Sequence, residues 1–407
     1  MANAVYPRVL EGTIQQDLQQ YPVVAVMGAR QVGKSTLCRK IAQDNGLSSC
    51  TLDDRDVLQK ALEAPEALLD DLGTGAFIDE AQRAPGLFLA IKAVVDRQQR
   101  PGAYLISGSN QPRVSGGVGD SLLGRAAYRT LRPLTLSELR LSERHPGWSF
   151  LFNEDDSALL SELETRADSS GQLDWRDIVR AGGFPRALAA PEEYRLRVLN
   201  DYVEVFASRD IREVLGVESP ERFEGFFRVI GAWTGQELNA SAVSRDLGIP
   251  VNTVRRWIDA LERSYLVELI QPYSRNASQR VIRAPKIFVV DPALALAAAR
   301  ETDPTGFHLE TLTCIDMAVW RDGAPSRAVY HWRLNSGQEV DFILQENQSL
   351  LPVEIKAATD IRGSDARHLR RFCELHSEAR RGILLTCDPE IRQLDRQIIA
   401  APWWAVI

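Results

Sequence analysis

Lysine is the residue that this sequence lacks most noticeably. Only six of its 48 basic residues are lysines, so arginine is used wherever a generic positive charge suffices. The lysine ammonium is a compact point charge, whereas the arginine guanidinium is broad and planar. A lysine retained against this bias indicates a position that needs the ammonium itself. The six are Lys34, Lys40, Lys60, Lys92, Lys286 and Lys356.

Cysteines and long apolar runs are also scarce. The five cysteines are scattered and form no C-x-x-C pair, which argues against a disulfide framework or a cysteine zinc site. No apolar run approaches the roughly 18 residues that span a bilayer, and the start of the chain lacks a basic and apolar leader. We therefore expect reduced thiols, no membrane partner and a cytoplasmic location.

Size and composition indicate several globular domains. A chain of 407 residues is too long for one ordinary core, so two to four domains are expected. With 44% hydrophobic and 25% charged residues, the composition is that of a folded protein. The net charge of −7 excludes a uniformly basic surface that coats nucleic acid, but not a local basic face.

The first half of the chain changes character near residue 140. Residues 1–140 alternate apolar runs with helical stretches, which predicts a parallel α/β sheet. The expected strands are Val23–Met27, Cys50–Leu52, Ala76–Ile78 and Ala103–Ile106, and the clearest helices are Ser35–Gln43 and Leu87–Arg97. Residues 141–220 lose the strand pattern and are expected to form an all-helical lid or linker.

The second half predicts two further domains. Residues 221–300 have the order of a winged helix: a helix, a helix–turn–helix and a two-stranded wing. Its expected elements are Phe223–Trp233, Ala240–Leu247, Asn252–Ser264, Leu266–Ile270 and Val281–Val290. Residues 301–407 predict a second α/β unit. Its expected helices are Glu310–Trp320 and Ala366–His376, and its strands are Val329–Leu334, Glu339–Gln345, Leu350–Ile355 and Gly382–Thr386.

A nucleotide site is predicted where the first strand ends. The sequence there fits G-x-x-x-x-G-K-[ST], in which backbone N–H groups cradle phosphates. Lys34 would reach the β- and γ-phosphates of ATP, and Ser35 would ligate Mg²⁺. The predicted nucleotide-binding residues are Gly28, Ala29, Arg30, Gln31, Val32, Gly33, Lys34, Ser35 and Thr36.

Acidic and polar residues follow the next strands. Asp79 is expected to hold Mg²⁺ through water, and Glu80 to polarise the attacking water. The alternative for this pair is a solvated strand end. After the following strand, Asn110 or Ser109 would sense the γ-phosphate, unless the segment is a simple turn.

Arginines that could stabilise transition-state charge are harder to single out. Arg125 is the first candidate, acting in its own subunit or across a subunit boundary. Because arginine is abundant here, a surface ion pair is an equal alternative. Arg209 is a weaker candidate from the lid.

Several of these segments together resemble one family, the bacterial and archaeal AAA-type ATPases that carry a conserved, uncharacterised C-terminal domain. The resemblance covers nearly the whole chain and implies ATP binding. It is carried by Gly28–Thr36, Phe77–Gln82, Ser107–Asn110, Leu122–Arg125, Pro133–Glu138, Gly182–Pro185, Glu339–Phe342 and Val353–Lys356.

The winged-helix segment is a candidate DNA-binding element. Residues 221–290 hold ten basic and seven acidic residues, a local excess of three positive charges. Such a segment suits DNA phosphates and base edges, but winged helices also dock proteins. The candidate DNA contacts are Asn252, Thr253, Arg255, Arg256, Arg275 and Arg280, with Arg283 and Lys286 as further backbone contacts.

The C-terminal unit resembles a PD-(D/E)xK nuclease core. Glu354 and Lys356 are two residues apart on a strand and therefore share a face, which Asp341 on the neighbouring strand can meet. Asp341 and Glu354 would bind Mg²⁺, Lys356 would polarise water, and Glu310 would complete the acid set. The alternative is an amphipathic hairpin with a solvated charged face.

These observations predict a Mg²⁺-dependent AAA-type ATPase that acts as a homo-oligomer on double-stranded or branched DNA. Its fold class would be α/β: a P-loop core of AAA type, a helical lid, a winged helix and a nuclease-like domain. Two alternatives remain. The C-terminal domain could be an inactive protein-interaction module of a nucleotide-dependent switch, or the chain could be a DNA-anchored regulator.

Overall fold

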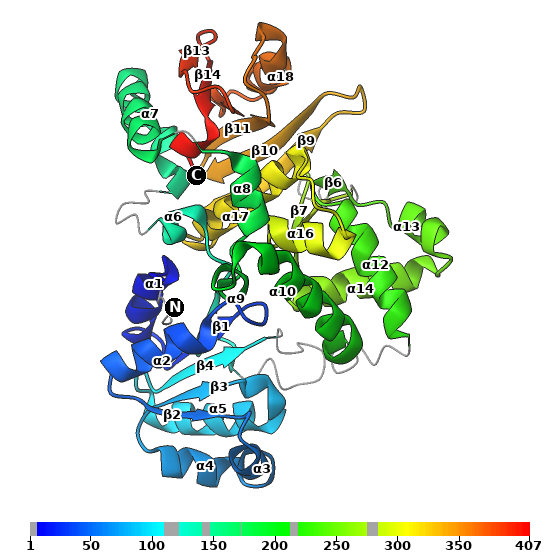
Figure 1. Cartoon of the computed structure of the whole chain (residues 1–407). Helices are drawn as coiled ribbons and strands as arrows, with labels where there is room; N and C mark the ends of the chain where they lie inside the picture. Colours follow the sequence, from blue (N-terminus) through cyan, green and yellow to red (C-terminus); the bar gives the residue numbers. More distant parts are fainter. Residues whose placement is uncertain (1–5, 110–121, 141–146, 172, 212–218, 275–283) are drawn as a thin grey trace. The chain divides into compact units, whose positions relative to one another are not determined.

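The computed structural model describes residues 6–109, 122–140, 147–171, 173–211, 219–274 and 284–407 (Figure 1). The chain separates into two compact units. The first comprises residues 1–134 and 263–266, and the second comprises residues 135–262 and 267–407. The finer division into core, lid, winged helix and nuclease-like domain stays a prediction.

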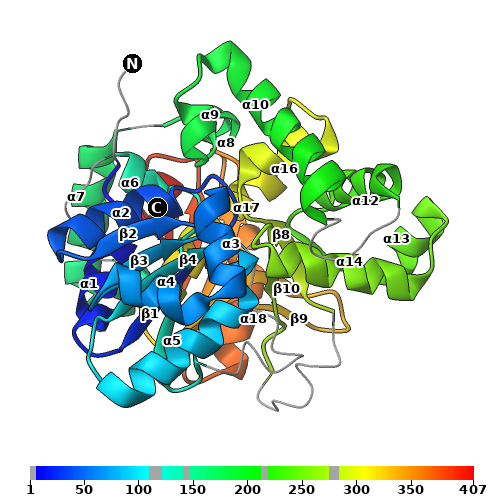
Figure 2. The same ribbon diagram turned by 90° about the horizontal axis from the view of Figure 1, so that it is seen from below.

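The first unit is built on a five-stranded sheet in the order β2-β3-β4-β1-β5. All neighbouring strands are parallel. The strands are β1 (Val23–Met27), β2 (Ser48–Thr51), β3 (Ala76–Asp79), β4 (Tyr104–Gly108) and β5 (Ala126–Thr130). Helices cover both faces (Figure 1, Figure 2), as expected for a parallel sheet. They are α1 (Leu10–Leu18), α2 (Lys34–Asp44), α3 (Arg55–Glu63), α4 (Pro65–Leu72) and α5 (Pro85–Gln98).

The predicted α/β class is confirmed, but strand β5 of this sheet was not predicted from the sequence. Three central strands, β1, β3 and β4, are buried along their whole length, so they read as apolar runs. Strand β5 lies at the sheet edge and pairs only with β1 in the ordering of the sheet. Among the described residues it has a neighbouring strand on one side only, and most of its residues are not fully buried, so its sequence AAYRT has no continuous apolar signal.

Helices dominate the first part of the second unit, where α6 (Leu136–Leu139) opens with a capping box between Thr135 and Glu138. The helices that follow are α7 (Asp156–Ser170), α8 (Trp175–Ala181), α9 (Pro185–Leu188) and α10 (Glu192–Val205). Short 3₁₀ and π turns lie at Gly147–Phe152 and Phe206–Asp210. This succession of helices agrees with the helical character expected for residues 141–220.

A helix–turn–helix and a small sheet come next. Their elements are α12 (Pro220–Ala232), β6 (Gln236–Glu237), α13 (Ala240–Leu247), α14 (Val251–Arg263), β7 (Val267–Ile270) and β8 (Lys286–Val289). Strand β8 pairs antiparallel with both β6 and β7. Phe223 and Phe226 of α12 pack against Trp257 of α14, which fixes the two helices to each other.

A six-stranded mixed sheet in the order β13-β14-β12-β11-β10-β9 forms the C-terminal part. Its strands are β9 (Arg327–Arg333), β10 (Glu339–Glu346), β11 (Ser349–Lys356), β12 (Gly382–Thr386), β13 (Arg392–Gln393) and β14 (Ile398–Pro402). Helix α17 (Gly306–Asp322) precedes the sheet, and α18 (Arg367–Leu375) follows β11. A short 3₁₀ turn at Gly363–Ala366 leads into α18, and another at Trp403–Ala405 follows β14.

Helix α16 (Pro292–Ala299) had no predicted counterpart. All eight of its residues are buried, so its sequence PALALAAA shows no polar face and no helical period. It packs against α10 and α12 of the same unit. In the described part of the chain, no helix is both long and apolar enough to cross a membrane.

Candidate functional site

The glycine-rich loop joins β1 to α2 in the first unit. Lys34 begins α2, and its ammonium donates to the carbonyl oxygens of Gly28 at 3.0 Å and Ala29 at 2.8 Å. An ammonium has three hydrogens to donate, and these two bonds to the loop use two of them. The Lys34 side chain is buried, and this burial lowers its pKa although Glu80 and Asp79 act in the opposite direction.

The backbone of the loop has the shape that phosphate binding requires. Gln31 and Gly33 have φ of 64° and 99°, so left-handed residues turn the N–H groups inward. A Cβ on Gly28 would lie 2.2 Å from the carbonyl oxygen of Leu131, so only glycine fits there. Ser35 and Thr36 lie in the first turn of α2, where free N–H groups and the helix dipole favour anions.

Two carboxylates stand at the carboxyl end of β3. Asp79 is buried and accepts a hydrogen bond from Ser107 Oγ of β4. Glu80 accepts one from Gln82 Nε2, and Ser109 Oγ lies 3.4 Å from the same carboxylate oxygen, Glu80 Oε2. The ends of β3 and β4 therefore orient both acids beside the loop that follows β1.

Glu80 and Gln82 also carry signs of a site built for a ligand. Glu80 has φ of 56°, a strained conformation for a residue other than glycine. Gln82 donates to Ser109 Oγ at 3.1 Å, while its own Oε1 is buried and has no hydrogen-bond partner within the described residues. The donor set fits a nucleotide with Mg²⁺, because Mg²⁺ is held by one or two carboxylates together with phosphate oxygens.

The structure does not bring Arg125 to this loop. Arg125 precedes β5 and lies beside Val23 at the start of β1, whereas the loop begins after Met27. The two ends of β1 are about 13 Å apart. The guanidinium forms an ion pair with Asp96 at the end of α5, with one N–O distance of 3.0 Å. A role for Arg125 at its own nucleotide is thus not supported, and a role across a subunit boundary stays a prediction.

Other predicted residues fall outside the described part of the chain. They are Asn110, the side chain of Arg209, and the wing residues Arg275, Arg280 and Arg283. On α14, Asn252, Arg255 and Arg256 are exposed, and Thr253 is half-buried. Lys286 was expected to contact DNA, and this expectation is wrong because its side chain is only 3% exposed.

Lys286 instead enters a group of acids in the second unit. We call Glu310 (α17), Glu339 and Asp341 (β10) and Glu354 (β11) the carboxylate cluster. The Lys286 ammonium lies 2.9 Å from Glu339 Oε1, 3.2 Å from Asp341 Oδ1 and 3.6 Å from Glu310 Oε2. Burial alone would lower its pKa, but Asp341, Glu310 and Glu339 together raise it above the usual value.

The structure also brings Asp341, Glu354 and Lys356 together. Asp341 Oδ2 accepts a hydrogen bond from the backbone N–H of Ile355 at 3.0 Å. Lys356 pairs with Glu354 at 2.7 Å, as expected for residues that share a strand face. However, no group of three or more His, Cys, Asp or Glu side chains among the described residues is placed to hold a metal ion. Lys286 lies beside Asp341 and Glu310, and the metal-binding role of Asp341, Glu354 and Glu310 stays a prediction.

Burial raises the pKa values of two acids of the carboxylate cluster. It raises the pKa of Glu354 to about 8, with a further contribution from the charge of Asp341. Burial, together with Asp341, also raises the pKa of Glu310 well above its usual value. The Oε2 atom of Glu354 has no hydrogen-bond partner among the described residues.

We expect the free energy of unfolding to fall less with rising pH in Glu354→Gln than in the wild type. A carboxyl group with a raised pKa in the folded state stabilises the fold below its unfolded pKa, near 4.5, and loses this contribution as the pH rises through about 8. Urea unfolding of the wild type should therefore show falling stability across this window, and Glu354→Gln should show a smaller fall. The exposed Glu374→Gln is the control. A wild-type profile in Glu354→Gln would contradict the assignment.

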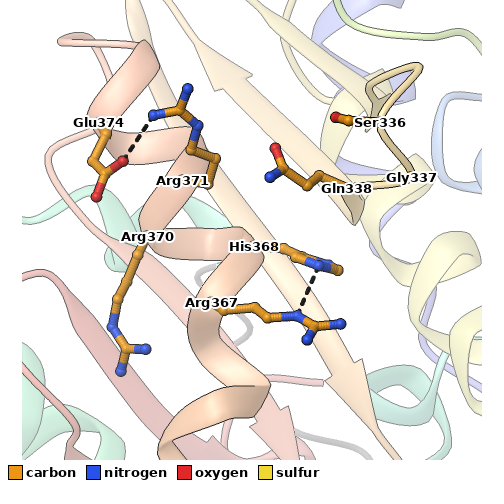
Figure 3. A pocket seen from close by; sticks show the side chains of 8 residues that line it. All are labelled: Ser336, Gly337, Gln338, Arg367, His368, Arg370, Arg371 and Glu374. Carbon is orange, nitrogen blue, oxygen red and sulfur yellow. Dashed lines mark hydrogen bonds and ion pairs between the residues drawn. The ribbon is translucent and has the colours of Figure 1, made fainter.

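A separate hollow of about 530 Å³ lies between α18 and the turn before β10 (Figure 3). It is lined by Ser336, Gly337, Gln338, Arg367, His368, Arg370, Arg371 and Glu374. Arg371 pairs with Glu374 at 3.0 Å, and Arg370 pairs with Asp395. Arg367 contacts only His368 among the hydrogen bonds and ion pairs of the described residues. Among the described residues that line the hollow, Arg367 is thus an arginine without an acidic partner.

The sheet order, the glycine-rich loop after β1 and the acids after β3 define an AAA-type P-loop ATPase domain, fused here to a C-terminal domain that contains a mixed sheet. Residues 20–140 match the family model described as an AAA domain. Residues 172–305 and 305–406 match two domains of unknown function, DUF8612 and DUF4143.

Two mycobacterial proteins are similar to this chain in sequence. The uncharacterized proteins Rv2008c of Mycobacterium tuberculosis and Mb2031c of Mycobacterium bovis are each 28% identical over 358 residues, which cover 84% of this chain and 72% of theirs. Among solved structures, the Walker-type ATPase paby2304 of Pyrococcus abyssi aligns over 72% of this chain and 96% of its own at 14% identity and a TM-score of 0.39. The RuvB Holliday junction branch migration motor of Thermotoga maritima aligns over 69% and 90% at 16% identity and a TM-score of 0.28.

Proposed function

We propose that this chain is a Mg²⁺-dependent ATP hydrolase that acts on DNA. The observation that carries the ATPase proposal is the position of Lys34 on the loop carbonyls, together with Asp79 and Glu80 oriented at the neighbouring strand end. Lys34 and the loop N–H groups would bind the phosphates, and Ser35 and Asp79 would hold Mg²⁺. Glu80 would accept a proton from the attacking water.

The DNA proposal depends on residues 220–289. The order α12, β6, α13, α14, β7, β8 is that of a winged helix, and α14 would be its recognition helix. Asn252, Arg255 and Arg256 are exposed near the start of α14, while Val254 and Leu261 are buried. In the described part of the chain, neither arginine forms an ion pair, which leaves both guanidinium groups available for phosphates.

The direct test is ATP turnover with and without duplex, branched and single-stranded DNA, followed by gels of the same reactions with Mg²⁺ or Mn²⁺. Turnover that DNA stimulates would support the proposal, and the DNA that stimulates most would identify the substrate. ATP turnover that no DNA changes, with no DNA bound or cut, would overturn the DNA part and leave an ATPase directed at another partner.

We expect the double substitution Arg255→Ala and Arg256→Ala to weaken DNA binding. Loss of two phosphate contacts should reduce the slope of log K against log salt by about 2. Fluorescence anisotropy at several salt concentrations measures this. Arg392→Ala is the control, because Arg392 is already paired with Asp388 and Glu390. An unchanged slope would remove α14 from the interface, and a change in Arg367→Ala alone would move the contact to α18.

The arrangement of Lys286 favours one alternative, a nucleotide-dependent switch whose C-terminal domain cuts nothing and binds a protein. A buried lysine lies among the carboxylates, and its ammonium supplies a charge that a metal ion would otherwise provide. DNA cleavage that requires Mg²⁺ or Mn²⁺ and is lost in Asp341→Ala would exclude this alternative. Absence of cleavage together with DNA-independent turnover would favour it.

A further inference from the structure

The carboxylate cluster is built around a positive charge. Glu310, Asp341 and Glu354 are 9%, 8% and 6% exposed, and such burial is unfavourable for several negative charges unless a cation accompanies them. Glu310 Oε2 and Glu354 Oε2 are buried and have no hydrogen-bond donor within the described residues. The four acids come from α17, β10 and β11, so they meet only in the folded second unit.

Lys286 brings its charge from a different sheet. In β8 it pairs with Ile270 of β7 and with Glu237 of β6, so its backbone belongs to the three-stranded sheet. Its side chain reaches three members of the cluster, at N–O distances of 2.9 to 3.6 Å. The three-stranded sheet therefore supplies the positive charge beside Glu310, Glu339 and Asp341, while Lys356 of β11 supplies the charge that pairs with Glu354.

We propose that the Lys286 ammonium occupies the cation position of the carboxylate cluster and thereby excludes divalent metal ions from it. Metal–oxygen distances of about 2.0–2.6 Å require carboxylates closer together than an ammonium permits. This accounts for the absence, among the described residues, of a group of three or more acids placed to hold a metal. An ammonium and a divalent cation also repel each other, so they exclude each other from one buried position.

The consequence is that metal uptake by the C-terminal domain depends on the pairing of β8. While β8 is paired with β6 and β7, Lys286 stays in the cluster. Only withdrawal of Lys286 would free Glu310, Asp341 and Glu354 to approach a metal ion. This inference does not depend on ATP hydrolysis, because it concerns the second unit alone.

The test is to measure Mn²⁺ binding to the full chain without nucleotide, with electron paramagnetic resonance as the readout. We expect wild type and Asp341→Asn to bind Mn²⁺ equally. Lys286→Met keeps the length of the side chain but not its charge, and it should bind Mn²⁺ about tenfold or more tightly than the wild type does. The double variant Lys286→Met/Asp341→Asn should lose this gain. Lys286→Arg should gain none, because it retains a cation. Lys92→Met, at a lysine outside the cluster, is the control.

Two results would overturn the inference. One is an Mn²⁺ site in the wild type that is lost in Asp341→Asn. This result can be obtained even if no Lys286 variant folds. The other is a Lys286→Met protein that unfolds cooperatively as the wild type does and still gains no site. If Lys286→Met does not fold, Lys286→Met/Glu339→Gln removes one charge of each sign and keeps Glu310, Asp341 and Glu354, and the same gain is expected from it. Failure of both variants to fold would make Lys286 a purely structural charge and would also overturn the inference.

Discussion

Replacing Lys34 with alanine should abolish ATP turnover, with a loss on the order of 10³-fold or more in kcat/KM. The ammonium is the group that meets the β- and γ-phosphates. In the structure it also holds the carbonyl oxygens of Gly28 and Ala29, so its removal takes away both a phosphate contact and a support of the loop. Equilibrium binding of a fluorescent ATP analogue and steady-state phosphate release together measure both losses.

Two variants make this experiment specific. Lys40→Ala alters an exposed lysine of the same helix, which pairs with Glu11, and should leave turnover unchanged. Lys34→Arg should also fail, because a planar guanidinium does not fit the position of a buried ammonium. Normal turnover in Lys34→Ala would contradict the assignment of the nucleotide site to this loop.

Replacing Glu80 with glutamine should reduce kcat by about 10²–10⁴-fold while ATP binding is retained. The amide keeps the shape of the side chain but accepts no proton from water. Gln82 and Ser109 orient the carboxylate, so the substitution changes the chemistry of a group that is already positioned. A single-turnover measurement with preformed enzyme–ATP complex separates hydrolysis from binding.

The exposed Glu66→Gln on α4 is the matched control for Glu80→Gln and should keep wild-type turnover. If Glu80→Gln lost ATP binding and kcat together, the residue would act on the loop and not on water. If it kept the wild-type kcat, the proton acceptor would have to be another residue, and Asp79 would be the next one to substitute.

Central strands of the first sheet were easier to predict from the sequence than its edge strand β5. Strands β1, β3 and β4 are buried on both faces, so their apolar runs were visible in the sequence. Strand β5 was missed because it has only one neighbouring strand within the described residues and is only partly buried, and helix α16 was missed because it is buried all round. The helix–turn–helix residues were predicted to within a few positions, since α13 and α14 each keep one apolar face.

In the candidate sites, the residues whose partners are distant in sequence were the ones that the sequence did not predict. Gln82 was part of the family resemblance but had no predicted role, because its bonds to Glu80 and Ser109 depend on how β3 and β4 pair. Lys286 was misjudged as a DNA contact. Two signals could have corrected this: the rarity of lysine and its place at the head of the apolar run Ile287–Val290. Both suggested a buried ammonium, but neither named its acidic partners.

The sequence by itself determined the glycine-rich loop and its lysine, because that chemistry is carried by consecutive residues whose backbone conformation is local. It also determined the α/β class, since burial on both faces of a parallel strand leaves a direct trace in residue type. Tertiary structure alone decided where single charged side chains lie. Arg125 is at the opposite end of β1 from the loop, and Lys286 lies among acids of α17 and β10. The physical reason is that one charge contributes to stability through its spatial neighbours, and strand pairing, not order along the chain, brings those neighbours together.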